Sequence, residues 1–231
     1  MMKTKHTALA LFLAMTAIAN FAIAQPPPAP NESTNDEGAA KLERLPNGDV
    51  KLGAIRLCRD TRTLSFPATT EIRTGPIEVL ISSPTGRLHE ALLEADVSAL
   101  HLQVMMYLAG LENGARLPGG EVGQGDLVDI HVEWTDADGE TRRQPVEYFL
   151  RDRRAEDGKQ RAGWVFVGSS AQAGELLAET EGNLVLTWSQ GETILDTADP
   201  EGNDDTLFTA HTEHLKTIPK GAQITVIITP R

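Results

Sequence analysis

The amino-acid sequence predicts a β-rich α+β domain, with antiparallel sheet(s) and one main helix packed across them. Two observations lead to this fold class. Short apolar runs of β character alternate with Gly, Pro, Asn and Asp along most of the chain. Only residues 96–111 repeat apolar side chains at three- and four-residue steps, as an amphipathic helix does. Because no internal repeat or second linker follows residue 40, we expect residues 41–231 to form a single globular domain.

Residues 1–24 have the pattern of a cleavable signal peptide. Two lysines precede an apolar run at residues 8–18, and Ala22-Ile23-Ala24 supplies a small-residue cleavage site. The alternative, an uncleaved membrane anchor, needs about 20 unbroken apolar residues, and Asn20 interrupts the run. We therefore expect cleavage after Ala24 and a periplasmic or secreted location.

Residues 25–40 are rich in Pro, Asn and acidic residues and contain no apolar face that could be buried. Such a composition is typical of a disordered tether. No later stretch is long and apolar enough to span a bilayer, so no membrane span is expected after cleavage of the signal peptide.

Within residues 41–231 the apolar runs predict a series of short strands, several of them joined as hairpins. The turns are expected at 59–61, 83–86 and 136–139, where Gly, Pro, Asp and Thr cluster. The predicted strands are 53–57, 62–66, 77–82, 88–94, 127–134, 144–150, 164–167, 184–188, 207–210 and 223–228.

The predicted helix begins after Asp96, whose carboxylate can cap it, and ends at Asn113-Gly114, where a left-handed conformation is favoured. Its apolar stripe is expected to lie on a sheet. That stripe comprises Val97, Leu100, Val104, Leu108 and Leu111.

The charge and cysteine content restrict the possible partners. The formal net charge is −12, which repels nucleic acid and anionic lipid headgroups and favours neutral or cationic partners. Cys58 is the only cysteine, so no disulfide can form within the chain. We interpret Cys58 as a semi-buried small side chain; the alternative is a reactive or dimer-forming thiol.

Several segments in the same order resemble the YdjY-type domain family of bacterial exported proteins, and together they span most of the predicted domain. These segments are Ile72–Leu80, Gly86–Leu93, Leu100–Val104, Val132–Asp136, Gly163–Ser169 and Glu181–Leu184.

The resemblance implies no specific activity, because the role of the family is not established. Some of its members carry a ferredoxin-like label. An iron–sulfur cluster is typically held by four thiolates, and Cys58 alone cannot supply them. No cofactor is therefore expected.

His89, Glu90 and His101 form the best candidate site. His89 and Glu90 fall on the predicted strand 88–94, and His101 lies early in the predicted helix, so a tight connection could bring the two imidazoles together. Two histidines and a carboxylate could bind a divalent metal or perform acid–base catalysis. Alternatively, His101 is a histidine at the edge of the core, and His89 and Glu90 point to opposite faces of a regular strand.

Two further groups were considered. His211 and His214 are three residues apart in a predicted strand or turn, which favours solvated loop histidines over a metal pair. Residues 196–205 contain enough acidic side chains for a calcium site but lack the glycine and the final glutamate of an EF-hand loop. We interpret this stretch as an exposed loop.

The leading hypothesis is therefore an exported, non-enzymatic binding module that interacts with a protein or envelope component. The alternative is a metal-dependent or acid–base enzyme that uses His89, Glu90 and His101.

Overall fold

The computed structural model describes residues 40–231 except 72, 115–124, 156–161, 189–192 and 200–203. The expected signal peptide at 1–24 and nearly all of the expected tether at 25–40 lie outside the described residues. Ala40–Arg231 form one compact unit. In the part of the chain that the structure describes, no helix is both long and apolar enough to cross a membrane.

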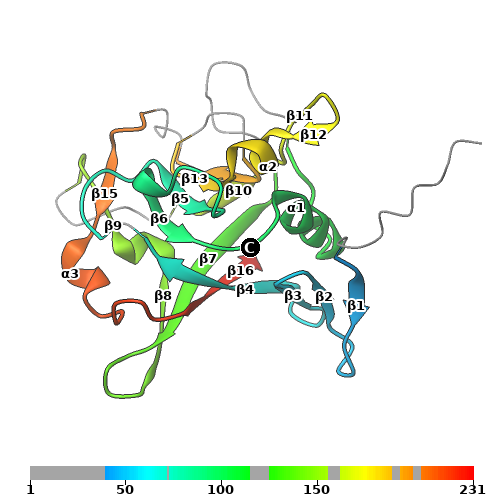
Figure 1. Ribbon diagram of the computed structural model, residues 1–231, viewed down its shortest axis with the longest axis horizontal. Coiled ribbons are helices and arrows are strands. Elements are labelled where there is room, and N and C mark those ends of the chain that lie inside the picture. The colour runs from blue at the N-terminus through cyan, green and yellow to red at the C-terminus, as the bar shows by residue number, and fades with distance from the viewer. Residues whose placement is uncertain (1–39, 72, 115–124, 156–161, 189–192, 200–203) are drawn as a thin grey trace, which may run out of the picture. The chain divides into compact units, whose positions relative to one another are not determined.

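The main sheet closes on itself as an eight-stranded barrel. The closure comes from pairing of Thr69 and Thr70 with Glu94 and Leu93, which joins the first strand of the ring to the last. In order around the ring, the strands are β4 (Thr63–Thr70), β16 (Ile224–Pro230), β7 (Leu127–Thr135), β10 (Trp164–Phe166), β14 (Leu195–Thr197), β13 (Asn183–Leu186), β5 (Val79–Ser82) and β6 (Ala91–Glu94) (Figure 1).

Other strands extend the barrel or form small sheets beside it. The extensions are β1 (Leu42–Arg44), β2 (Val50–Leu52) and β3 (Ile55–Cys58), which continue from β4, and β8 (Thr141–Pro145), which pairs with β7. The small sheets are β11 (Ala171–Gln172) with β12 (Glu175–Leu176), and β9 (Leu150–Asp152) with β15 (Phe208–Ala210). The helices are α1 (Ala99–Leu108), α2 (Leu177–Glu181), α3 (Thr212–Leu215) and the 3₁₀ helices η1 (Leu88–Glu90) and η2 (Val146–Phe149).

The β-rich character is as predicted, but the sheet is mixed rather than antiparallel. β5 pairs with β6 in parallel, and β13 pairs with β14 in parallel. The predicted turn at 83–86 forms, with the Gly86 N–H donating to the Ser83 carbonyl oxygen at 3.0 Å. It does not lead into a hairpin, because η1 carries the chain back to the start of β5 before β6 begins.

Two predicted strands are shorter than expected because part of each is a 3₁₀ helix. Residues 88–90 of the predicted strand 88–94 belong to η1, and residues 146–149 of the predicted strand 144–150 belong to η2. Their apolar alternation was not sufficient evidence for extended backbone, since a 3₁₀ turn of three or four residues can carry the same pattern.

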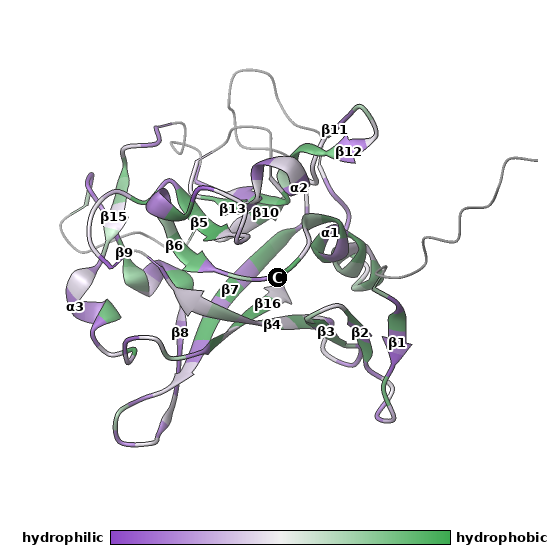
Figure 2. Ribbon diagram, in the orientation of Figure 1, coloured by the Kyte–Doolittle hydropathy of each residue, from purple (hydrophilic) through white to green (hydrophobic). Residues whose placement is uncertain are grey.

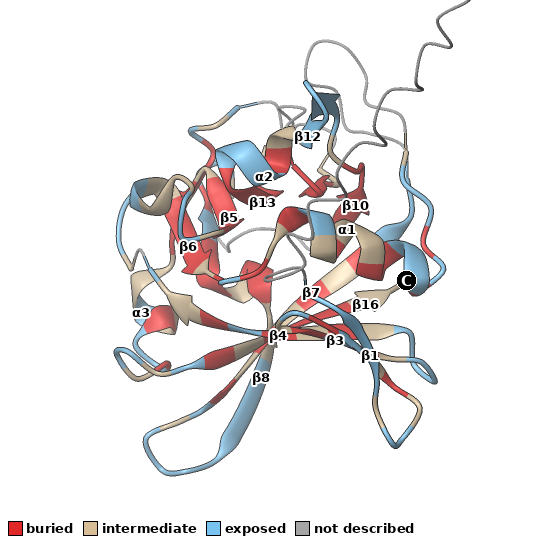
Figure 3. Cartoon of the chain, turned by 45° about the vertical axis from the view of Figure 1, so that its right-hand side comes forward, coloured by how far each residue is buried: buried red, intermediate tan, exposed pale blue. Residues whose placement is uncertain are grey.

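The core fills the barrel and the space under α1. Figure 2 shows hydrophobic residues along β5, β6 and β7, and Figure 3 shows β5, β13 and β10 buried while β8 is mostly exposed. Such burial of apolar surface is the main favourable term in folding. The largest fully buried side chains include Trp164, Phe66, Phe149, Phe166 and Phe208.

Helix α1 is shorter than predicted and buries a different face. Ser98 rather than Asp96 caps it, because the Ser98 Oγ accepts a hydrogen bond from the backbone N–H of His101 at 3.3 Å. The helix ends at Leu108, and Gly110, whose φ is +75°, follows the C-cap residue Ala109 in a left-handed conformation. The side chains that α1 buries are Ala99, Leu102, Met105 and Met106. Leu100 and Leu108 of the predicted stripe are instead 50% and 49% exposed.

Candidate functional site

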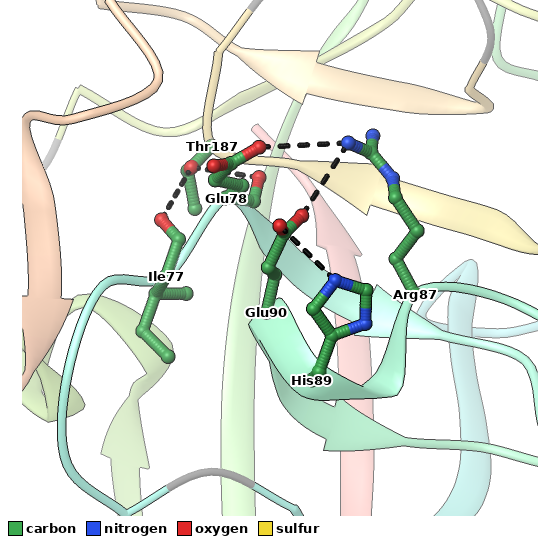
Figure 4. Close-up of polar contacts among 6 residues, drawn as sticks. All are labelled: Ile77, Glu78, Arg87, His89, Glu90 and Thr187. Atoms are coloured by element: carbon green, nitrogen blue, oxygen red, sulfur yellow. Dashed lines mark hydrogen bonds and ion pairs between the residues drawn. The ribbon is translucent and has the colours of Figure 1, made fainter.

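The ends of three neighbouring strands bring a group of charged residues together at one rim of the barrel (Figure 4). Glu78 directly precedes β5, and Glu90 ends η1 directly before β6. Because β5 and β6 are parallel, both residues lie at the same edge of the sheet. The Glu78 N–H donates to the Glu90 carbonyl oxygen at 3.1 Å, which fixes the two backbones side by side.

Thr187 anchors this rim from the third strand. It directly follows β13, and its Oγ1 lies 3.0 Å from the carbonyl oxygen of Ile77 and 2.9 Å from that of Glu78. Thr187 is fully buried. The backbone that carries Glu78 is therefore held from both of its neighbouring strands.

Two basic side chains contact the pair of carboxyl groups. Arg87 Nη1 lies 3.5 Å from Glu78 Oε2 and 3.5 Å from Glu90 Oε2. His89 Nε2 lies 3.2 Å from Glu90 Oε1. The two glutamates are 22% and 26% exposed, whereas the His89 side chain is 76% exposed. We call Glu78, Arg87, His89 and Glu90 the rim cluster.

The electrostatics of the rim cluster favour a proton on Glu78. Desolvation raises the pKa of Glu78 above its ordinary value of 4.5, and the negative charges of Glu90 and Asp205 raise it further. A hydrogen bond with the Glu90 carboxyl group acts in the same direction, while Arg87 opposes the shift. Because like charges that lie close together resist simultaneous ionisation, the proximity of Glu90 helps Glu78 to keep its proton to a higher pH than an isolated glutamate would.

This arrangement is suited to two kinds of chemistry. When both carboxyl groups are ionised and the His89 ring is neutral, the rim cluster carries more negative than positive charge and can accept hydrogen bonds from a cation. When one carboxyl group keeps its proton, the pair combines a proton donor with a proton acceptor, as general acid–base catalysis requires.

The structure brings His89 and Glu90 into contact but places His101 at a different part of the fold. His101 lies in the first turn of α1, and its ring packs over Gly53 in the turn between β2 and β3. There, a Cβ on residue 53 would lie 3.0 Å from His101 Nδ1. Within the described ranges, no three His, Cys, Asp or Glu side chains gather so that they could hold a metal ion.

His211 and His214 lie on a short helix rather than in the expected loop. His211 caps α3, and its imidazole ring stacks on that of His214. The ring centroids are 3.5 Å apart and the angle between the ring planes is 2°. The ring of Tyr148 stacks on the other face of the His214 ring, with 3.8 Å between the ring centroids. His214 Nδ1 donates to the Tyr148 carbonyl oxygen at 2.6 Å, because a carbonyl oxygen can only accept. Burial, and then the proximity of His214, lower the pKa of His211 and so favour the neutral form of that ring.

The acidic stretch at 196–205 is partly outside the described residues. Of its described members, Asp196 is buried in β14 and Asp199 forms an ion pair with Arg154. Asp204 accepts hydrogen bonds from both the N–H and the hydroxyl of Thr206. Asp196 therefore lies in a strand rather than in the expected loop, whereas Asp204 is exposed, and residues 200–203 lie outside the described residues.

Glu78 and Arg87 were missed by the sequence analysis. Glu78 falls inside the predicted strand 77–82, and Arg87 lies in one of the segments that resemble the YdjY-type family. One signal could have identified Glu78. Glu78 and Glu90 each stand immediately before an apolar run, and parallel pairing of those runs would place both carboxyl groups at one edge.

Comparison with known proteins finds no matching family model, no matching curated protein and no matching solved structure. The YdjY-type resemblance therefore stays a prediction based on the sequence segments given above.

Proposed function

We propose that the protein is an exported binding domain of the YdjY type that uses the rim cluster to hold a cationic group of a protein or envelope component. We place it in the periplasm or outside the cell, without a cofactor, and class its fold as α+β with α1 as the main helix. The observation that supports this function is the position of the Arg87 guanidinium, whose Nη1 lies 3.5 Å from a carboxyl oxygen of Glu78 and 3.5 Å from one of Glu90.

The balance of charge at the rim favours a cation over other ligands. Arg87 lies 3.5 Å from each glutamate, at the outer limit of a hydrogen bond, so it satisfies neither carboxylate fully. Asp205 adds a further negative charge near Glu78. An ammonium or guanidinium group at the rim would form short, charge-assisted hydrogen bonds with the same oxygens. The net charge of −12 would also attract such a partner from a distance.

We expect a tri-arginine peptide to bind more tightly as the pH rises. The bound cation favours ionised Glu78, whose pKa lies above 4.5, so affinity should increase as the pH rises from 4.5 through that pKa. Replacing both glutamates (Glu78→Gln with Glu90→Gln) should weaken binding at pH 7.5 by at least about 10-fold, because a hydrogen bond to a charged group contributes about 1.5–3 kcal/mol. Isothermal titration calorimetry measures both effects.

The matched control is Glu43→Gln with Glu71→Gln, which removes the same charge from two exposed positions. The control should bind the peptide like the wild-type protein. Equal loss of binding in the two double variants would mean that the net charge, and not the rim cluster, attracts the peptide. A pull-down from envelope extract with both variants then separates partners that depend on the rim cluster from those that do not.

The second candidate function is an acid–base enzyme. It is supported by the raised pKa of Glu78, which suits this residue to act as the proton donor. Glu90, which His89 contacts, would act as the proton acceptor. In that case turnover of a substrate would be lost in Glu78→Gln alone, whereas the binding function should keep part of its affinity as long as Glu90 remains ionised.

A further inference from the structure

A cleft of about 480 Å³ lies beside the start of α1, at a site unrelated to the rim cluster. One wall comes from α1, and the other comes from β12, the turn before it and α2. In Figure 3, α1, α2 and β12 lie at the same part of the molecule. The residues that line the cleft are Leu100, Gly174, Glu175, Leu176, Glu179 and Thr180.

Hydrogen bonds hold the two walls of the cleft together. Glu179 Oε2 accepts from the Ser98 hydroxyl and from the backbone N–H of Leu100, each at 3.0 Å. A carboxylate at this position also interacts favourably with the N-terminal end of α1. The cleft is thus bordered by two helices joined through a defined contact.

An exposed apolar face of α1 continues from the cleft. Leu100 and Leu108 are 50% and 49% exposed, and their spacing of eight residues places them on one side of the helix. The opposite side of α1 packs into the core through Leu102 and Met105. Large apolar side chains that gather on an exposed surface mark interaction sites, so the outer face of α1 is suited to a partner.

The charges around the cleft indicate the chemistry of that partner. The lining contains the carboxylates of Glu175 and Glu179 and no lysine or arginine. A second copy of the chain would bring the same two glutamates into a symmetric contact, where like charges repel. A basic amphipathic segment would instead offer apolar side chains to Leu100 and Leu176 and cations to the glutamates.

We propose that the cleft and the outer face of α1 dock a basic amphipathic helix of a partner protein. Its apolar side chains enter the cleft beside Leu100 and Leu176, and its lysines or arginines pair with Glu175 and Glu179. Helix-in-groove binding of this type is a common mode of peptide recognition. The proposal is independent of the rim cluster, because the two sites share no residues.

A labelled 14-residue helical peptide of Leu and Lys tests the proposal by fluorescence anisotropy. The wild-type protein should bind it, and Leu100→Ser with Glu175→Lys should weaken binding at least 10-fold. The matched control is Leu42→Ser with Glu43→Lys, which changes an exposed leucine and an exposed glutamate at β1 and should leave binding unchanged. Glu78→Gln with Glu90→Gln should also bind the peptide, which distinguishes this site from the rim cluster.

Three results would overturn the proposal: no binding of the Leu–Lys peptide, equal binding by the cleft variant and the control, or equal binding of a Ser–Lys peptide, which carries the charge without the apolar face. A wild-type dimer that Leu100→Ser with Glu175→Lys dissociates, measured by light scattering, would assign the face to a second copy instead. If the double variant does not melt like the wild-type protein, Glu175→Lys alone, at an exposed position, replaces it with the same expected direction.

Discussion

Replacing Phe166 by alanine is expected to destabilise the protein by about 3–5 kcal/mol, the usual cost of deleting a buried aromatic ring. Phe166 is fully buried in β10, and its ring meets that of Tyr107 at 5.3 Å in an edge-to-face contact. The ring therefore lies where α1 packs on the barrel. Removing it leaves a cavity that the surrounding strands can close only in part.

Urea unfolding followed by circular dichroism measures this loss. Leu42→Ala is the control, since Leu42 is 56% exposed and its truncation should change the free energy of unfolding by no more than about 0.5 kcal/mol. A Phe166→Ala variant as stable as the Leu42→Ala variant would show that α1 does not pack on β10 in the way described.

Replacing Gly182 by alanine should destabilise the protein by about 3 kcal/mol, from a left-handed backbone and a steric clash together. Gly182 has a φ of +71°, and a Cβ at this position would lie 2.4 Å from the Cα of Gly86. The Gly86 atom belongs to the backbone, and the position of a Cβ is fixed by the backbone of its own residue, so no side-chain rotation can relieve the contact. This close approach joins the start of β13 to the turn that leads into η1.

Gly139→Ala separates the two causes. Gly139 also has a positive φ, of +84°, but nothing lies within 4 Å of a Cβ there. Its substitution should cost only the backbone strain of about 1–2 kcal/mol. Thermal unfolding of the two variants should therefore differ, with Gly182→Ala melting at the lower temperature; equal melting temperatures would contradict the close approach of Gly86 and Gly182.

The sequence predicted the β-rich character because that depends on local signals. Runs such as 127–134 and 223–228 alternate in the way that a half-buried strand requires, and Gly139 marks the turn after the first of them. The closure of the barrel could not be predicted in this way. It depends on the pairing of Thr69 and Thr70 with β6, which lies more than twenty residues further along the chain.

The limits of periodicity also explain the errors in α1. Nearly every residue of 97–109 is apolar or small, so the pattern fits more than one helix face, and the predicted stripe included Leu100 and Leu108, which the structure leaves half exposed. Ser98 and Asp96 are both good capping residues. Tertiary contacts favour Ser98: the Ala95 N–H donates to the Ser82 carbonyl oxygen, and the Ser98 hydroxyl and the Leu100 N–H both donate to Glu179.

The candidate site was only partly accessible from the sequence. His89 and Glu90 are adjacent, so their proximity needed no knowledge of the fold, and the structure places them in contact. Glu78 joins them because β5 and β6 pair in parallel. The turn signal at 83–86 instead favoured a hairpin, in which the two strands would be antiparallel. His101 is close to Glu90 in the sequence, but it belongs to α1, which places its ring beside the turn between β2 and β3.

A carboxyl ¹³C NMR titration of Glu78 and Glu90, with and without the tri-arginine peptide, tests the central claim most directly. The account predicts that Glu78 titrates above 4.5 in the free protein and that saturating peptide lowers its pKa, because a bound cation favours the ionised form. A Glu78 carboxyl group that titrates at or below 4.5, and whose titration the peptide does not change, would contradict both the raised pKa of Glu78 and the proposed binding of a cation.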